Sequence, residues 1–113
     1  MKLQLHPEAE EELFEAAGWY DDRAVSLGDD FLAEVERWLA AVPETPLAWP
    51  RWLGAPEIEP PIRRAVMLRF PFSIAYQAFE DRVFVLAFAH TSRRPFYWVE
   101  RVASVLQPQS LPA

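Results

Sequence analysis

A histidine, two adjacent arginines and a tyrosine lie close together in the stretch HTSRRPFYW, which follows a strongly apolar run in the second half of the chain. His90, Arg93 and Tyr97 are competent to cleave an RNA phosphodiester, since imidazole and phenol groups can move protons while a guanidinium stabilises developing negative charge. Arg64 lies on an earlier apolar run and can add a second cation. The same residue types also cap strands and fill cores, so the spacing leaves a purely structural role open.

Other kinds of chemistry find little support in the sequence. Cysteine is absent, the two histidines are far apart, and the three glycines form no phosphate-binding loop, so no metal and no cofactor are implied. Four carboxylates gather in residues 8–12, and we interpret them as a solvated helix face. A chain without cysteine suits a reducing cytoplasm, and no apolar run reaches the roughly 18 residues of a membrane span. We therefore expect a cytoplasmic protein that does not contact a membrane.

Charge is divided unevenly between the two halves. Residues 1–60 contain 14 acidic and 4 basic residues, whereas residues 61–113 contain 3 and 7, within a net charge of −6. An anionic target is therefore expected to meet the C-terminal half. A solvated helix surface followed by ordinary strand arginines would give the same distribution.

The first half predicts a strand followed by two helices, within one domain that spans residues 1–113. Alternating apolar residues over 2–5 predict a short edge strand, and helical spacing of apolar residues predicts one helix over 7–22 and another over 27–42. We expect Ser26 to begin the second helix through a capping box and Pro43 to stop it.

A proline-rich connector over residues 43–62 follows, and Trp49, Trp52 and Leu53 are expected to anchor it onto the core.

The second half predicts an antiparallel meander with strands at 64–70, 72–79 and 82–89. Both helices should cover one face of this sheet, which gives an α+β fold. A short strand or helix is expected over 96–105, and the tail 107–113 is expected to fray. The predicted buried residues include Leu13, Phe31, Val35, Trp38, Ile74, Tyr76, Val85 and Ala87.

One long segment resembles the C-terminal half of RelE/ParE toxins, which belong to bacterial type II toxin–antitoxin (plasmid stabilisation) systems: RRAVMLRFPFSIAYQAFEDRVFVLAFAHTSRRPFYWVER. The shared pattern comprises an arginine-containing strand, a Phe-Pro-aromatic turn, an Ile-x-Tyr strand, an acidic hairpin, an aliphatic strand, and then His, Arg, Pro and Tyr-Trp. The resemblance covers about residues 2–102. It implies a helical hairpin on one face of a twisted antiparallel sheet, a cognate antitoxin as partner, and inhibition of growth.

The family divides by target, since RelE-like members cut messenger RNA on the ribosome whereas ParE-like members poison DNA gyrase. RelE-like nucleases carry a catalytic arginine on the middle strand and another basic residue after the last strand, and Ser73 and Thr91 occupy these places here. The acidic net charge also departs from the balance common in ribosome-directed toxins. We therefore favour a ParE-like, gyrase-directed toxin.

Two alternatives stay open. The first is a metal-independent, ribosome-dependent endoribonuclease in which His90, Arg93, Tyr97 and Arg64 would be catalytic. The second is a non-toxic binding module with the toxin fold. In the gyrase-directed reading, Arg93 and Tyr97 would instead anchor a protein interface.

Overall fold

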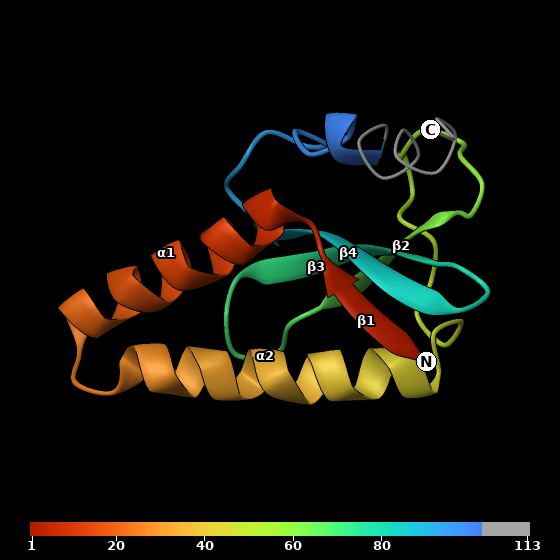
Figure 1. Ribbon diagram of the computed structural model, residues 1–113. Helices are drawn as coiled ribbons and strands as arrows, with labels where there is room; N and C mark the ends of the chain where they lie inside the picture. The colour runs from red at the N-terminus through yellow and green to blue at the C-terminus, as the bar shows by residue number, and fades with distance from the viewer. Residues whose placement is uncertain (103–113) are drawn as a thin grey trace, which may run out of the picture.

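A helical pair and a four-stranded sheet make up residues 1–102, the part of the chain that the computed structural model describes (Figure 1). The elements in chain order are β1 (Lys2–Leu5), α1 (Pro7–Arg23), α2 (Leu27–Glu44), β2 (Ile62–Val66), β3 (Phe72–Ala78) and β4 (Arg82–His90). The order of elements along the chain is the predicted one.

The sheet has the strand order β1-β4-β3-β2. Strands β2, β3 and β4 form the predicted antiparallel meander. Strand β1 does lie at an edge, but it pairs in parallel with β4, so the complete sheet is mixed. The direction of an edge strand is difficult to read from its own sequence, because alternating burial looks the same in either direction.

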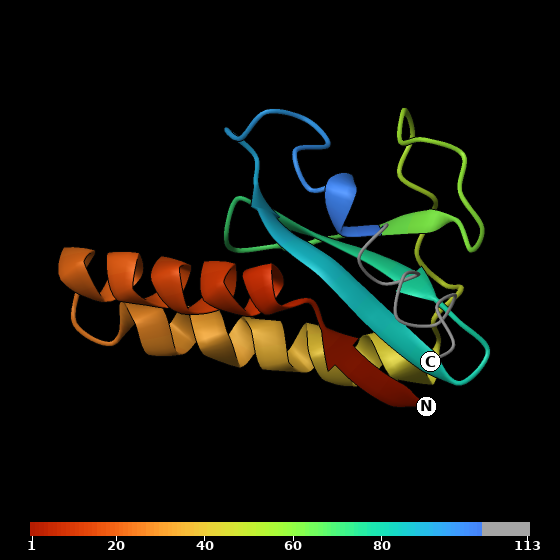
Figure 2. The same cartoon turned by 45° about the horizontal axis from the view of Figure 1, so that its top comes forward.

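Both helices pack against one face of the sheet, as predicted (Figure 2). Seven of the eight predicted core residues are buried, and the exception is Trp38, which is only half-buried. Trp38 lies on the side of α2 that faces the connector, where its ring meets that of Trp49 with the centroids 5.6 Å apart. The prediction of full burial was wrong because helical spacing does not show where the sheet ends.

A β-bulge in β4 changes which side chains face the helices. Leu86 is an extra residue in β4, since the two residues that flank it pair with consecutive residues of β3. Val85 packs with the helices before the bulge and Phe88 packs with them after it, whereas Ala87 joins the cluster on the opposite face. Residues two apart in a strand share a face, so His90 lies on the same face as Phe88. The bulge therefore places His90 on the face of the sheet that α1 covers.

The turn between α1 and α2 is not the predicted capping box. Ser26 adopts a left-handed conformation with φ 66° and makes no side-chain capping hydrogen bond. The carboxylate of Asp21 instead accepts the backbone N–H of Gly28 at 2.8 Å. A Cβ on Gly28 would lie 2.3 Å from the carbonyl oxygen of Ala17, so the close approach of the two helices requires glycine at this position.

Helix α2 runs past Pro43, contrary to the prediction, and ends at Glu44. A proline in the last turn removes only one donor, and the backbone N–H of Thr45 still bonds to the carbonyl of Ala41 at 3.3 Å.

The connector after α2 is held by two of its three predicted anchors. Trp49 packs against the core cluster between the helices and the sheet, and Trp52 packs against the cluster on the opposite face of the sheet. Leu53 is 90% exposed, so its prediction as an anchor was wrong.

Strand β2 begins at residue 62, before the predicted 64, and it ends at residue 66, before the predicted 70, because a carboxylate of α2 binds the chain that follows it. Oε2 of Glu34 accepts the backbone N–H groups of Leu68 and Arg69 at 2.9 and 3.3 Å. These two N–H groups are therefore not available for strand pairing, and β2 ends at Val66.

The segment after β4 crosses the face of the sheet opposite the helices, where Trp98 and Val102 are buried. Its described residues form turns and then a helical stretch from Glu100 to Val102, and the rest of the strand or helix predicted over 96–105 lies outside the described residues. The predicted tail, 107–113, lies outside the described residues. Within residues 1–102, no helix combines the length and apolarity that crossing a membrane requires.

Candidate functional site

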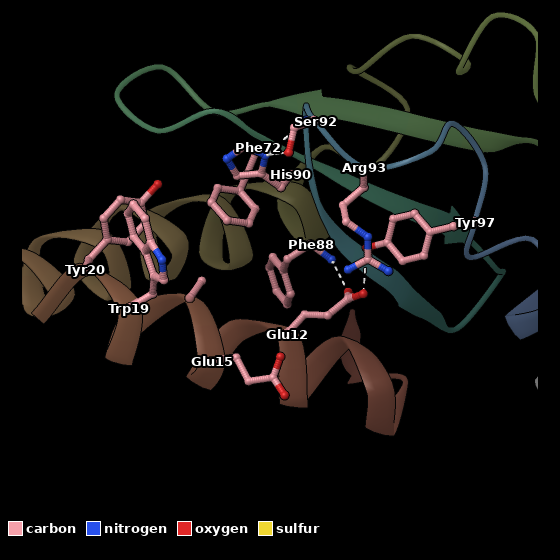
Figure 3. Close-up of a pocket in the computed structure, with 11 residues that line it drawn as sticks. Glu12, Glu15, Trp19, Tyr20, Phe72, Phe88, His90, Ser92, Arg93 and Tyr97 are labelled. Atoms are coloured by element: carbon pink, nitrogen blue, oxygen red, sulfur yellow. Dashed lines mark hydrogen bonds between the residues drawn. The ribbon is translucent and has the colours of Figure 1, made fainter. Parts of the chain in front are cut away.

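Two cavities meet at the end of β4. The first, here called the α1 cavity, has a volume of about 410 Å³ and lies between α1 and β4, with Glu12, Trp19 and Phe88 among its lining residues (Figure 3). The second, the sheet-end cavity, has a volume of about 250 Å³, with Trp52 and Ser73 among its lining residues.

The four predicted site residues come together at these cavities. His90, Arg93 and Tyr97 line both of them, and Arg64 lines the sheet-end cavity. The shared wall of the two cavities is therefore the HTSRRPFYW segment singled out by the sequence.

Both ring nitrogens of His90 have assigned roles in the neutral side chain. Nδ1 accepts the backbone N–H of Ser92 at 3.0 Å and lies 2.7 Å from the Ser92 hydroxyl oxygen. Because Nδ1 is an acceptor, the proton of the neutral imidazole lies on Nε2. The ring also packs edge-on against Phe72, with the centroids 5.0 Å apart. In this tautomer Nδ1 is engaged by Ser92, and Nε2 is the ring nitrogen that can donate.

The phenol of Tyr97 is held by a carboxylate from the other end of the sequence. Its hydroxyl donates to Oε2 of Glu12 at 2.6 Å. Burial, together with this hydrogen bond and the negative charge of Glu12, raises the pKa of Tyr97 well above its ordinary value. Tyr97 is therefore a weaker acid than a free tyrosine, and its proton is directed into the protein.

Glu12 connects α1, β4 and the C-terminal segment. Besides Tyr97, it accepts the backbone N–H of Phe88 at 3.0 Å and two guanidinium N–H groups of Arg101 at 3.0 and 2.9 Å. Its side chain is only 13% exposed. The prediction of a solvated face was wrong for this residue, whereas Glu10 and Glu11 are exposed as expected.

Arg93 is the exposed member of the cluster. Its guanidinium carbon lies 4.0 Å from the centroid of the Tyr97 ring, so the cation rests on a phenol that Glu12 holds in place. Figure 3 shows the guanidinium of Arg93 beside the Tyr97 ring. This stacking leaves the guanidinium N–H groups at the rim of both cavities.

Arg64 reaches across from β2 toward β3. Its Nε donates to the hydroxyl of Ser73 at 3.0 Å, and its guanidinium carbon lies 4.7 Å from the ring centroid of Trp52. With Arg93 and Arg94, it makes three arginines around the sheet-end cavity. This concentration of positive charge stands out in a chain with a net charge of −6.

Comparison with known proteins supports the fold. No protein-family model and no curated protein matches the sequence. Among solved structures, the chain is similar to one described as "Chromosomal ParDE TA system from P. aeruginosa", with a TM-score of 0.62 and 16% identity over 81% of this chain and 97% of that chain. The two chains share a fold. The predicted RelE/ParE-like α+β class is thereby confirmed.

Several site residues of this RelE/ParE-like fold were missed by sequence reasoning. Glu12 was detectable in principle, since it lies one helical turn before Ala16 and therefore beside the apolar stripe of α1. Arg101 and Ser92 carried no local signal, because their roles depend on contacts with other elements or on a turn. Within residues 1–102, no group of three or more His, Cys, Asp or Glu residues is placed to hold a metal ion.

Proposed function

We propose that this protein is the toxin component of a type II toxin–antitoxin pair, that an antitoxin neutralises it, and that it acts in the ParE-like manner on DNA gyrase. The fold shared with a chain of the ParDE TA system supports the proposal that the protein is a toxin of such a pair. The arrangement of His90, Arg93 and Tyr97 supports the choice of a protein target over RNA cleavage.

The observation that carries this choice is the state of the two proton-transfer groups. Cleavage of RNA needs a base for the 2′-hydroxyl and an acid for the leaving oxygen. Nδ1 of His90 is occupied by Ser92, and the Tyr97 proton is bonded to Glu12. Arg93 remains as an exposed cation on an aromatic ring, a combination that often anchors protein interfaces.

A RelE-like endoribonuclease is the second candidate, and one contact favours it. The guanidinium of Arg64 lies at Ser73, one of the two positions where the nucleases carry a cation, and so partly restores the missing charge. In this version His90 or Tyr97 would move the proton while Arg93 and Arg64 hold the phosphate. It would need no metal ion.

The antitoxin is expected to bind in the groove between the helical layer and the sheet. The α1 cavity opens there and has an apolar floor that includes Phe72 and Phe88. Occupation of this cavity would cover Arg93 and Tyr97, so binding and neutralisation would follow from one contact.

Expression in bacteria tests the proposal. The wild type is compared with His90→Ala, Arg93→Ala and Tyr97→Phe while growth, transcript integrity and plasmid supercoiling are followed together. We expect growth arrest with intact transcripts and gyrase-linked DNA breaks, and less arrest in Arg93→Ala. Cleaved transcripts that disappear in His90→Ala would establish the nuclease instead. A wild type that does not slow growth would favour the non-toxic binding module.

A further inference from the structure

A third cavity, here called the α2 cavity, lies between α2 and the connection from β2 to β3, and has a volume of about 320 Å³. Figure 1 shows this connection reaching α2. None of its lining residues lines the α1 cavity or the sheet-end cavity, so a ligand here would be distinct from anything bound at the site described above. The lining comprises one carboxylate, two arginines and three apolar side chains: Glu34, Arg37, Trp38, Ala41, Leu68 and Arg69.

The carboxylate of Glu34 is the buried member of this lining, with 3% exposure. Its Oε2 accepts the backbone N–H groups of Leu68 and Arg69 and the indole N–H of Trp38. Its Oε1 is also buried, but it has no hydrogen-bond partner among the described residues. A buried acceptor without a donor costs free energy, and this cost is recovered when a donor reaches it. Oε1 is therefore the atom of this cavity at which a donor from outside the chain would gain most.

The wall around Glu34 is largely apolar and one part of it can move. Its volume lies at the lower end of the range of small-molecule sites, which suits one ring or two fused rings. Oε1 is closed to solvent, so a ligand reaches it by displacing a wall side chain. Trp38 moves at the lowest cost, since it is half-buried and its 3.4 Å hydrogen bond is the longest of the three that Oε2 accepts.

Two exposed guanidinium groups flank the cavity, from Arg37 on α2 and Arg69 on the connection. Arg69 lies 3.9 Å from Asp30, and both of these side chains are more than half exposed. Two nearby positive charges disfavour a cationic ligand, but they attract the face of an aromatic ring. A plain hydrocarbon would leave Oε1 without a donor. The ligand that satisfies every part of the cavity is therefore neutral, aromatic and equipped with one donor.

We propose that the α2 cavity binds a neutral aromatic group that carries an N–H or O–H donor, as indole and phenol do. The donor bonds to Oε1 of Glu34, the ring packs against Ala41 and Leu68, and the two arginines meet the ring at the mouth. The same chemistry is available in a free small molecule and in a side chain of another protein. The site does not depend on the function proposed above.

Heteronuclear NMR of the isotope-labelled full chain, titrated with indole and with N-methylindole, tests the site. Indole should shift the backbone signals of Leu68 and Arg69 and the indole signal of Trp38 saturably, with a dissociation constant of about 1 mM, as befits so small a ligand. N-methylindole keeps the ring but lacks the donor. It should bind about tenfold more weakly, because hydrogen bonds to a charged acceptor are among the stronger ones. Phenol and anisole form a second pair with the same expected difference.

Variants of the protein locate the ligand without removing Glu34. Ala41→Phe fills the cavity and should weaken indole binding about tenfold or more. Ala40→Phe is the matched control, because Ala40 is the neighbouring exposed alanine and does not line the cavity, and it should change affinity by less than about twofold. Trp38→Phe removes the hydrogen bond that closes the path to Oε1, so it should bind indole severalfold more tightly. Thermal unfolding confirms that each variant is folded.

N-acetyltryptophanamide distinguishes the two sources of the ligand. Binding tighter than that of indole supports a protein side chain as the natural ligand, whereas binding of indole alone supports a small molecule. The proposal is overturned if indole gives no saturable shift up to about 10 mM, or if its shifts are confined to residues around the α1 cavity. It is also overturned if N-methylindole binds as tightly as indole, or if Ala41→Phe binds indole as tightly as Ala40→Phe.

Discussion

The hydroxyl of Tyr97 donates a 2.6 Å hydrogen bond to the carboxylate of Glu12, a residue 85 positions earlier in the chain. The same carboxylate is paired with Arg101, so Glu12 of α1 holds both Tyr97 and Arg101 of the segment that follows β4. Arg93 in turn rests on the ring of Tyr97. The position of the exposed cation at the cavity rim therefore depends on a single carboxylate of α1.

Glu12→Gln is expected to destabilise the protein by about 2–3 kcal/mol, because the largely buried guanidinium of Arg101 loses its buried charged partner and keeps the exposed carboxylate of Glu8, 3.3 Å away. Urea unfolding measures the change. Glu11→Gln is the control, since this neighbouring carboxylate is exposed and its loss should stay within about 0.5 kcal/mol. Equal effects of the two substitutions would show that the buried network contributes no specific stability.

The two helical glycines should respond in opposite directions to alanine. Gly28→Ala places a Cβ 2.3 Å from the Ala17 carbonyl oxygen and 2.6 Å from the Asp21 carboxylate. The helices must separate to admit it, which should cost about 1–3 kcal/mol. Gly18→Ala meets no atom within 4 Å and should stabilise α1 by about 0.5–1 kcal/mol. Thermal unfolding of both variants checks the pair, and similar shifts for both would contradict the close helix contact.

Glu34 should make stability depend on pH in the acidic range. Burial favours its neutral form, but hydrogen bonds from the backbone N–H groups of Leu68 and Arg69, a further one from the Trp38 indole and the positive charge of Arg37 outweigh this, so the pKa of Glu34 is lowered below its ordinary value of 4.5. A lowered pKa in the folded state contributes stability that is fully present above the unfolded value and is lost as pH falls through the folded value.

Urea unfolding at a series of pH values measures this contribution. Glu34→Gln is expected to lower stability at neutral pH and to flatten the loss of stability below about pH 4.5. Glu36→Gln, an exposed change on the same helix, should leave the profile of the parent unchanged. A Glu34→Gln profile parallel to that of the parent at all pH values would rule out this role.

The sequence predicted the elements better than their relations. Periodicity located both helices, because burial on one face leaves a local pattern, whereas β3 and β4 are buried on both faces and were located by their content of Val, Ile, Phe and Tyr. The parallel direction of β1 and the bulge at Leu86 left no such pattern, since each is decided by pairing with another strand. The bulge matters most, because it changes which face of the sheet the residues between Leu86 and His90 point to.

The candidate site divides in the same way. His90, Arg93 and Tyr97 could be grouped from sequence because they lie within one short segment. Glu12 could not be joined to them, since its contacts reach across most of the chain. A glutamate among four near a helix start is more often solvated, and although the place of Glu12 beside the apolar stripe of α1 indicates partial burial, only the tertiary fold shows its partners.

Arg93→Ala and Arg94→Ala form the closest matched pair for the working surface. Both residues are exposed and adjacent, but Arg93 stacks on Tyr97 and lines both cavities, whereas Arg94 lines only the sheet-end cavity. If Arg93 anchors a protein target, its loss should cost about 2 kcal/mol of binding, or about thirtyfold in affinity, and Arg94→Ala should have little effect. The level of induced expression needed to arrest growth measures the difference. Equal losses in the two variants would instead indicate a diffuse attraction to phosphate, in which each arginine counts only as a charge.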